Sequence, residues 1–437
     1  MAPIWLGIDD TDSPEGGCTT WVLTELVRVA RDTGVDLLGE PRLVRLNPNI
    51  PWKTRGNAAL AARFGVGGGP PRVLGEIAGT PIVSFRRGRE LPLALRRRFV
   101  DATWQRVCEV AARAPATDPA LVATSRRPPP EIYWRAVREV VPVADVRSAL
   151  EEIGAEVRVR DGPRGIVGAA AAIAWPGRRA TWELLAYRHP ERFGTPRLVD
   201  PSSVRRAARR HSELFLCHDP RTRRILVAPH TPCPILFGLR SRRDAVLPRV
   251  LSEIRSEPIE RWLLFRTNQG TGDHLVPRMA RELGPFLSAE IDGTVRGSPR
   301  TVPGGHVRFD VVDREKTGVE CLAFEPTKTL PKVARSLTDG DVVRIWGSVG
   351  ESSVLRVEGI RLVRLVPRWT RENPRCPTCR RPARSLGRQR GFRCPGCRRR
   401  WSPESARERA VPRPFPVGVY HPTPSARRHL APRAPER

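Results

Sequence analysis

The sequence predicts a multidomain protein that combines α/β and α+β domains with a β-barrel and a small metal-bound ribbon. Its 437 residues are too many for one ordinary hydrophobic core, so roughly three or four domains are expected. Helix-like and strand-like patterns alternate in the first half, whereas strand patterns dominate residues 286–366. Two C-x-x-C pairs follow. Together these patterns predict two mixed domains, then a barrel, then a zinc-bound module.

Composition indicates a nucleic-acid partner. The formal net charge is +30, and a surplus of this size favours a polyanionic partner. All but four of the 76 basic residues are arginine, which suits bidentate contact with phosphate. Genomic base composition explains the scarcity of lysine but not the surplus over acid. No apolar run approaches a membrane span and no signal-peptide pattern opens the chain, so we expect a cytoplasmic protein with no membrane partner.

An α/β domain is expected over residues 1–127. Apolar residues recur at three- and four-residue spacing in Thr20–Arg31, which predicts an amphipathic helix. The other elements expected here are a strand at Ile4–Ile8, a strand at Pro41–Leu46, an Ala-rich helix after Asn57 and a helix over Leu95–Ala114.

Three carboxylates follow the first predicted strand. Asp9, Asp10 and Asp12 stand so close together that they repel one another unless a cation sits among them, and magnesium with a bound phosphate is the usual cation. We assign the magnesium to Asp9 and Asp12. The alternative is an ordinary turn rich in aspartate.

A phosphate cradle is predicted directly after these acids. A Gly-rich turn opens a helix on Thr19 and Thr20, and helix starts present free backbone amides and a positive dipole end to phosphate groups. With Thr11 they supply three hydroxyl groups close to the acids. The alternative is an ordinary threonine cap. The loop Lys53–Asn57 adds Lys53, Arg55 and Asn57, which could hold a triphosphate or an RNA backbone, although charged loops are usually just solvated.

A ferredoxin-like α+β domain is expected over residues 131–258, after the Pro-rich linker at 126–130. Its predicted elements are a helix at Ala144–Ile153, strands at Ala155–Arg160, Ile166–Trp175 and Trp182–Arg188, a helix at Ser202–Arg209, a hairpin of Leu214–Leu216 with Ile225–Val227, and a helix at Arg242–Ile254.

A connecting segment, residues 259–285, carries a polar, Gly-rich loop. Its amide, carboxylate and imidazole groups make it a candidate substrate loop, because loops carry sites more often than cores do. An ordinary polar connection is the alternative. The candidate residues are Asn268, Gln269, Asp273 and His274.

An OB-type barrel is expected over residues 286–366, because five strand patterns occur there with one helix, Thr329–Ser336, after the third. Such barrels commonly bind oligonucleotides.

A structural zinc ribbon is expected over residues 370–403. Two knuckles complete a four-sulfur tetrahedral site with no open position, and unpaired or redox cysteines are the alternative. The zinc ligands are Cys376, Cys379, Cys394 and Cys397. The basic, Pro-rich tail, residues 404–437, lacks apolar periodicity and is expected to be extended or disordered.

Several motifs in the same order resemble the archaeal isoleucine-tRNA agmatinylcytidine synthetase (TiaS) family over nearly the whole chain. They are Gly7-Ile8-Asp9-Asp10-Thr11-Asp12-Ser13, Cys18-Thr19-Thr20, Arg45-Leu46-Asn47-Pro48-Asn49-Ile50-Pro51, Thr54-Arg55-Gly56-Asn57, His230-Thr231-Pro232-Cys233-Pro234 and Arg266-Thr267-Asn268-Gln269-Gly270-Thr271. Gly17 departs from the methionine that the family more often has there, which alters packing but removes no chemical group.

The resemblance implies a kinase-like catalytic domain that uses ATP to activate the wobble cytidine of the CAU-anticodon isoleucine tRNA and condenses it with agmatine. It implies phosphorylation at Thr19 and metal and phosphate handling by Asp9, Asp10 and Asp12. Phosphorylating the carbonyl oxygen of cytosine would make it a leaving group for the amine of agmatine. The alternatives are a nucleic-acid-binding protein without catalysis and, more weakly, a protein kinase-like phosphotransferase.

Overall fold

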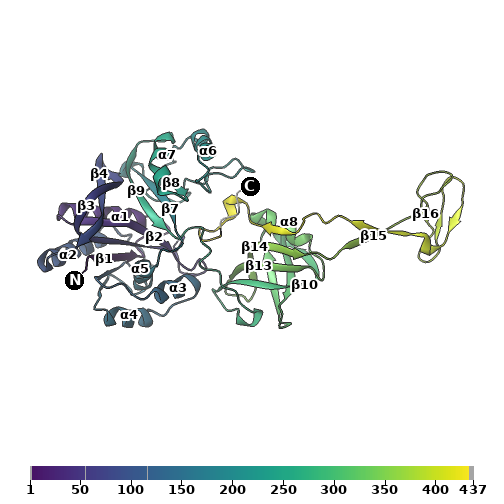
Figure 1. The fold of residues 1–437 in the computed structure, drawn as a ribbon, viewed down its shortest axis with the longest axis horizontal. Helices are drawn as coiled ribbons and strands as arrows, with labels where there is room; N and C mark the ends of the chain where they lie inside the picture. Colours follow the sequence, from purple (N-terminus) through teal and green to yellow (C-terminus); the bar gives the residue numbers. More distant parts are fainter. Residues whose placement is uncertain (1, 55, 116, 433–437) are drawn as a thin grey trace.

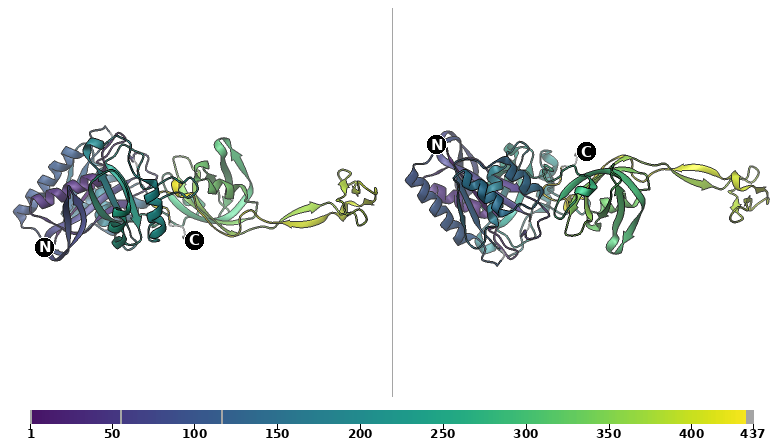
Figure 2. Two further views of the ribbon diagram at one scale, coloured as in Figure 1. Left: turned by 90° about the horizontal axis from the view of Figure 1, so that it is seen from above. Right: turned by 90° about the horizontal axis from the view of Figure 1, so that it is seen from below.

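The computed structural model describes residues 2–54, 56–115 and 117–432. Figure 1 shows a broad main body, which contains strands β1 to β9, a β-barrel beside it, and a thin arm that ends in the Cys-rich ribbon. Figure 2 shows that the arm projects away from both larger parts. Among the described helices, none is long and apolar enough to cross a membrane. The molecule is therefore a multidomain protein of mixed α/β class, as the sequence predicts.

One mixed sheet forms the centre of the main body. Its strand order is β6-β5-β1-β3-β4-β2-β9-β7-β8, with β1 antiparallel to both neighbours. It takes strands from the expected ranges 1–127 and 131–258 and from the connecting segment 259–285. The strands are β1 (Ile4–Asp9), β2 (Asp36–Arg45), β3 (Ala58–Ile77), β4 (Thr80–Arg89), β5 (Ala120–Thr124), β6 (Glu156–Val159), β7 (Thr181–Arg188), β8 (Ile235–Ser241) and β9 (Ile259–Thr267).

Helices cover both faces of this sheet and give it two hydrophobic cores. Ile4, Leu6 and Ile8 of β1 point into the first core, which also contains residues of α1 and α2. Side chains of successive strand residues point to opposite faces, so Trp5 packs against the second core, which contains residues of α3, α4 and α5. The helices of the body are α1 (Thr19–Asp32), α2 (Leu93–Val110), α3 (Pro130–Arg138), α4 (Val143–Glu152), α5 (Gly165–Ala174), α6 (Pro201–Arg210) and α7 (Leu247–Glu253).

Two Ala-rich segments differ from their predictions. The strand expected at Ile166–Trp175 is the helix α5, in which every residue except the half-buried Val167 is buried; a helix that is apolar nearly all round is typical of a protein core. The Ala-rich helix expected after Asn57 is the strand β3, whose successive residues alternate between the two cores. In both cases tertiary packing decides between helix and strand, since alanine fits a covered strand as well as a helix.

Smaller corrections concern the ferredoxin-like region. Leu214–Leu216 and Ile225–Val227 are not strands, but a short hairpin lies between them: His218 forms an antiparallel bridge with Ile225, and the amide of Leu226 donates to the carbonyl oxygen of Cys217 at 2.8 Å. The helix expected at Arg242–Ile254 is a 3₁₀ turn, Asp244–Val246, followed by α7.

The barrel contains the expected strands with a helix after the third. Parallel pairing of Cys321 in β12 with Leu355 in β14 joins the two edges, and apolar residues of all five strands pack with α8 in a core of their own. The elements are β10 (Ser288–Val302), β11 (His306–Val312), β12 (Gly318–Ala323), α8 (Thr329–Arg335), β13 (Val342–Val349) and β14 (Leu355–Arg364).

The arm is a two-stranded ladder. Strand β15 (Arg368–Glu372) runs out from the barrel and β19 (Arg407–Val411) returns beside it, with Glu372 opposite Arg407. Between them lie the short ribbon strands β16 (Arg384–Ser385), β17 (Phe392–Arg393) and β18 (Arg400–Trp401). The ribbon is thus an insertion carried on a hairpin.

The tail after the ribbon is extended as far as the described residues reach, which agrees with the first of the two expected alternatives, extended or disordered. Strand β20 (Gly418–Tyr420) adds to β14 of the barrel, and Leu430 is buried in the second core of the main body. Its stability comes from backbone pairing and a few anchoring side chains, which no apolar periodicity would reveal.

Close packing of α5 on β1 gives the first prediction. A Cβ at Gly7 would lie 2.2 Å from the carbonyl oxygen of Ala169. We expect Gly7→Ala to lower the free energy of unfolding by about 1–3 kcal/mol, because the helix must move away from the sheet. Chemical denaturation checks this, with Gly68→Ala on β3 as the control, since a Cβ there meets nothing within 4 Å. Equal stability of the two variants would contradict the packing argument.

Candidate active site

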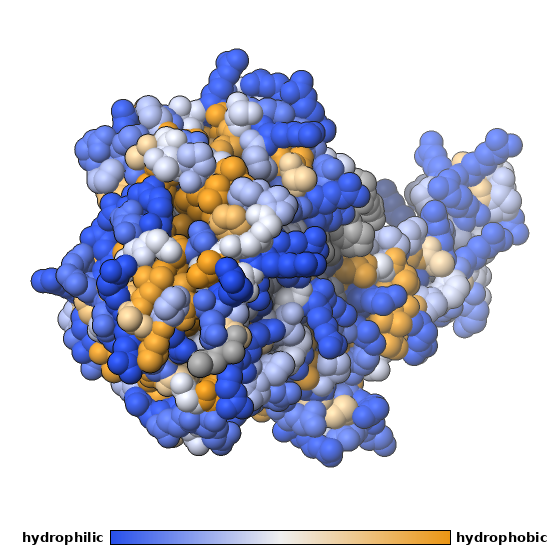
Figure 3. Space-filling model, turned by 60° about the vertical axis from the view of Figure 1, so that its left-hand side comes forward, coloured by the Kyte–Doolittle hydropathy of each residue, from blue (hydrophilic) through white to orange (hydrophobic). Residues whose placement is uncertain are grey.

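A cavity of about 790 Å³ opens in the main body beside the end of β1. Its walls come from the starts of α1 and α5, the loop before β3, parts of β7 and β8, and the tail after the ribbon. The molecular face drawn in Figure 3 is mostly hydrophilic, with apolar side chains gathered in patches. The predicted site residues that line the cavity are Asp9, Asp10, Asp12, Thr19, Thr20, Lys53, Asn57 and Gln269.

All three predicted carboxylates line this cavity. Burial, reinforced by the neighbouring Asp10, raises the pKa of Asp9 well above its ordinary value. Burial also raises the pKa of Asp10 to about 6, with Asp118 and Asp12 adding repulsion. Asp10 takes a backbone φ of 57°, a conformation uncommon outside glycine. Such a cluster favours a bound cation, because the cation relieves both the repulsion and the cost of burying charge.

Glycine on α5 makes room for Asp9. A Cβ at Gly168 would fall 1.8 Å from Oδ2 of Asp9. The carboxylate therefore lies directly on the backbone of the first turn of α5, and residues Arg164, Gly165 and Gly168 line the cavity beside it.

Two helix N-termini face the acids. At α1 the N-cap residue is Cys18 and at α5 it is Arg164, and neither side chain caps its helix. The free amides at the start of α1 and the positive dipole ends of both helices favour an anion between them, although the amides of Ile166 and Val167 at α5 already donate to the carbonyl oxygens of Pro163 and Arg164. The sequence patterns predict the start of α1 but not that of α5, for which they predict a strand. The glycines at 165 and 168, ahead of an alanine run, are the available signal.

The predicted hydroxyl groups differ in position. Thr19 and Thr20 line the cavity, and the thiol of Cys18 lies 2.9 Å from Oγ1 of Thr20. Thr11 is buried outside the lining, and its Oγ1 has no hydrogen-bond partner among the described residues.

Among its described residues, the loop before β3 presents Lys53 to the cavity. Lys53 donates from Nζ to the carbonyl oxygen of Ile50 at 2.9 Å, and burial, with Arg428 and Arg356 nearby, lowers its pKa. Asn57 shapes the loop by donating to the carbonyl oxygen of Asn47 at 2.8 Å. Arg55 lies outside the described residues.

A polar wall opposite the acids includes residues that the sequence analysis did not select. Buried Glu183 accepts from Nε of Arg240 at 3.0 Å, while the guanidinium of Arg45 stays 3.7 Å away. With its amide nitrogen toward Glu183, Gln269 donates to Oε2 at 2.9 Å and accepts from Arg240 at 2.8 Å. Arg45 is the less engaged cation of this wall, because its Nε has no hydrogen-bond partner within the described part of the chain.

Only Gln269 of the predicted substrate loop reaches the cavity. Asn268 grips the backbone of Arg45, accepting from its amide at 2.7 Å and donating to its carbonyl oxygen at 2.8 Å. Asp273 accepts from the hydroxyl of Tyr133 at 2.6 Å. His274 meets Glu358 of the barrel at 3.3 Å. These three side chains place the loop and join the body to the barrel.

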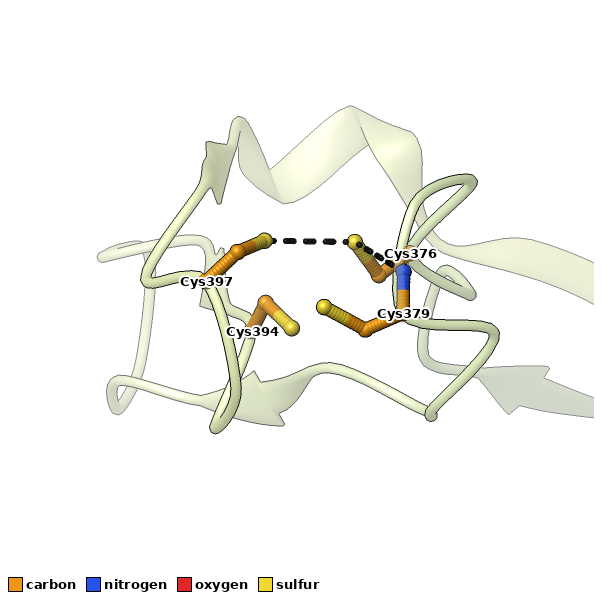
Figure 4. A group of neighbouring side chains, drawn as sticks. All are labelled: Cys376, Cys379, Cys394 and Cys397. Carbon is orange, nitrogen blue, oxygen red and sulfur yellow. Dashed lines mark hydrogen bonds between the residues drawn. The ribbon is translucent and has the colours of Figure 1, made fainter.

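The four predicted zinc ligands converge. Figure 4 shows their thiols pointing toward one another from two turns of the ribbon, and the ligand atoms all lie within 4.8 Å of one another. The amide of Cys379 donates to Sγ of Cys376 at 3.4 Å, and the amide of Gly396 to Sγ of Cys394 at 3.3 Å. Such N–H···S bonds suit thiolates, so the donor set fits a structural zinc. The Asp9 cluster forms no comparably tight group among the described residues.

Comparison with known proteins covers almost the whole chain. Family models match at residues 5–160 (TiaS TCKD domain), 163–274 (TiaS FLD domain) and 373–414 (TiaS C-terminal zinc ribbon domain). The isoleucine-tRNA 2-agmatinylcytidine synthetase TiaS of Methanosarcina mazei is 36% identical, over 98% of this chain and 96% of the relative. The protein of the same name from Archaeoglobus fulgidus is 35% identical with the same coverage.

Solved structures agree with these relatives. The complex of TiaS with its isoleucine tRNA and ATP is similar with a TM-score of 0.83 and 30% identity, over 99% of this chain and 96% of that one. The complex of TiaS with the same tRNA, AMPCPP and agmatine has the same identity and coverage with a TM-score of 0.79. A tRNA fluorescent labeling enzyme has a TM-score of 0.85 and 32% identity, over 98% and 96% of the two chains.

The cysteine cluster gives the second prediction. We expect the purified protein to carry about one zinc ion per chain, because four thiolates fill a tetrahedral site. Cys394→Ser removes one ligand and should lower the zinc content well below that level, as measured by elemental mass spectrometry. Cys108→Ser on α2, far from the ribbon in sequence and outside the cluster, is the matched control. Full zinc content in Cys394→Ser would exclude this ligand set.

Proposed function

The chain belongs to the TiaS family of isoleucine-tRNA 2-agmatinylcytidine synthetases, and from this premise we propose that it uses ATP to join agmatine to the wobble cytidine of the CAU-anticodon isoleucine tRNA. Full-length similarity to these relatives, in which every part of the chain has a counterpart, carries the proposal. The cavity supports it with an acidic cluster between two helix N-termini, an arrangement suited to a metal-bound polyphosphate.

The proposed chemistry has two steps. First, a phosphoryl group passes from ATP to the carbonyl oxygen of the cytosine ring, which turns a poor leaving group into a good one. The amine nitrogen of agmatine then forms a bond to that ring carbon, the carbon–oxygen bond breaks with release of phosphate, and the amine loses a proton. The ring thereby exchanges its oxygen for the agmatine nitrogen.

The cavity residues divide this work. Asp9 and Asp12 would hold magnesium, which neutralises phosphate charge when bound. The amides at the start of α1, with Thr20, Lys53, Arg55 and Asn57, would hold the remaining phosphate oxygens, and Asp10 would complete the acidic cluster; Thr11, expected among these groups, lies outside the cavity lining. Thr19 is the proposed site of phosphorylation. Apolar wall residues favour the neutral, attacking form of the amine, since burial disfavours an ammonium; among them are Val140, Val141, Leu226, Val227 and Ile235.

The finer fold assignments are also proposals. The strand and helix order of residues 286–366, with β12 beside β14, supports an OB barrel. Helices α6 and α7 packed on β7, β8 and β9 support a ferredoxin-like domain. Pairing of β6 with β5 and the family matches support a first, kinase-like domain that extends to residue 160. The reaction is placed in the cytoplasm, where tRNA is used.

A nucleic-acid-binding protein without catalysis is the competing function. It accounts for the charge, the barrel and the ribbon, but it gives no role to three carboxylates that line one cavity beside the starts of two helices. A test for the agmatine-modified cytidine distinguishes the two functions, because a protein that only binds nucleic acid would not form it.

The third prediction concerns catalysis. The purified protein with ATP, magnesium, agmatine and the tRNA transcript should give the mass gain of agmatine on the wobble nucleoside, as read by mass spectrometry. Asp9→Asn and Thr19→Ala should each lower the rate by about 1,000-fold, since the metal and phosphate contacts are worth several kcal/mol, while tRNA binding survives. Asp32→Asn, at the other end of α1, is the control.

No product from the wild-type protein, beside an active relative as positive control, would exclude the proposed reaction. Full activity of Asp9→Asn would instead exclude the site assignment.

The fourth prediction concerns RNA binding by the ribbon. Residues 373–406 carry ten arginines and one glutamate. Because Glu372 lies opposite Arg407, an Asn-Gly turn can join them and excise the ribbon. Filter-binding titrations over a range of salt should show weaker tRNA binding and a smaller slope of log Kd against log salt, by about 0.7–0.9 for each phosphate that the ribbon no longer neutralises. An unchanged slope would exclude phosphate binding by the ribbon.

A further inference from the structure

The chain crosses back to the main body after the ribbon. Strand β19 returns along β15, β20 adds to β14 of the barrel, and the amide of Thr423 donates to the carbonyl oxygen of Thr327 at 3.2 Å. The next residues, Pro424–Leu430, leave the barrel for the cavity; we refer to them as the return segment. Figure 1 shows this yellow stretch between the two larger parts.

Backbone hydrogen bonds fix the end of the return segment. The amide of Gly270 donates to the carbonyl oxygen of His429 at 2.8 Å, and the amide of Gly272 to that of Leu430 at 2.9 Å. The side chain of Leu430 is buried in the core around α5. At the other end, the hydroxyl of Ser425 donates to Asp219 at 2.7 Å. The segment is therefore held at both ends against the main body.

An ionic cluster joins the return segment to the barrel and the body. Arg428 lies 3.1 Å from Glu358 of β14 and donates to Asn49 at 2.5 Å, and His274 approaches the same glutamate. Although burial acts to raise it, Arg428 and His274 hold the pKa of Glu358 at about 2. Glu358, a buried carboxylate of the barrel, thus contacts both the return segment, through Arg428, and the main body, through His274.

The return segment forms part of the cavity wall, through Pro424, Ser425, Arg427 and His429. The His429 ring and the Arg45 guanidinium meet beside Gly56: a Cβ there would lie 2.7 Å from a terminal nitrogen of Arg45 and 3.3 Å from Cδ2 of His429. Arg45, burial and Arg240 lower the pKa of His429 well below its ordinary value. The imidazole is therefore neutral and packs beside Arg45, so it adds no positive charge to those of Arg45 and Arg240.

We propose that the return segment completes the catalytic cavity and that His429 is a positioning residue, which holds the guanidinium of Arg45 toward the phosphate groups of the bound nucleotide. Arg45 suits this role because Asn268 fixes its backbone, its ion pair with Glu183 is long at 3.7 Å, and its Nε is unpartnered within the described residues. The nucleotide in this statement rests on the proposed function.

Two chain variants separate the return segment from the ribbon. One ends at Thr423, and the other is the ribbon excision described above, which keeps the return segment. We expect the shortened chain to bind a nonhydrolysable ATP analogue with magnesium at least tenfold more weakly and tRNA within about threefold of wild type. The ribbon excision should bind tRNA more weakly than wild type and should bind the ATP analogue with close to wild-type affinity. Wild-type affinity of the shortened chain for the analogue would overturn the proposal.

Point variants test whether His429 acts through Arg45. His429→Ala should raise the Kd for the same analogue about tenfold, and His429→Gln, which keeps a neutral polar side chain, should recover most of the affinity. Arg45→Gln should weaken binding to a similar degree, and adding His429→Ala to it should cause less than a twofold further change. His421→Gln, from the same tail but against Trp346 of the barrel, is the control.

Independent effects of the two substitutions would overturn the role of His429, because a merely structural residue would weaken binding equally in both backgrounds. These measurements are binding constants, so they stand whether or not agmatidine forms. Failure of wild-type protein to bind the analogue would overturn the proposed function together with this inference.

Discussion

The close contact of α5 with β1 is the constraint on which the site depends. Gly7 and Gly168 carry no side chains, so the helix backbone approaches the strand until the Asp9 carboxylate lies on its first turn. A larger residue at either position would separate the acids from the helix dipole. Because α1 starts on the other side of the same acids, the cavity combines negative side chains with two positive helix ends. Neither feature alone would select a metal-bound polyphosphate.

The loop from Thr267 to His274 connects the main body to the rest of the molecule. Its side chains grip the backbone of Arg45, bind Tyr133 and reach Glu358 of the barrel, and its glycine amides hold the return segment. A loop whose side chains suit substrate chemistry thus acts mainly as a junction. The consequence is that one short stretch of backbone contacts the barrel, the tail and the cavity wall together, in addition to the separate contacts that Asn47 and Asn49 make with the start of the barrel.

Sequence patterns predict those parts of the fold that a clear periodicity or a fixed residue spacing specifies locally. The helix after Cys18, the strands and helix of the barrel and the four cysteines all follow from periodicity or spacing. The predictions for the two Ala-rich segments are wrong because alanine does not distinguish a buried helix from a covered strand. Arg45 opens one of the family motifs but is not selected as a site residue, because neither periodicity nor spacing assigns it a role. His429 stands alone in the sequence, and only the fold brings the two side chains together beside Gly56. The order of the tail depends on backbone hydrogen bonds to distant residues, which leave no periodic signal.

Chain order adds a consequence for synthesis on the ribosome. The acids and both helix starts emerge early, and the main body is made before the barrel and the ribbon. The wall that contains His429 is translated after all of them. A nascent chain therefore lacks this part of the cavity wall until the barrel and the ribbon have been made.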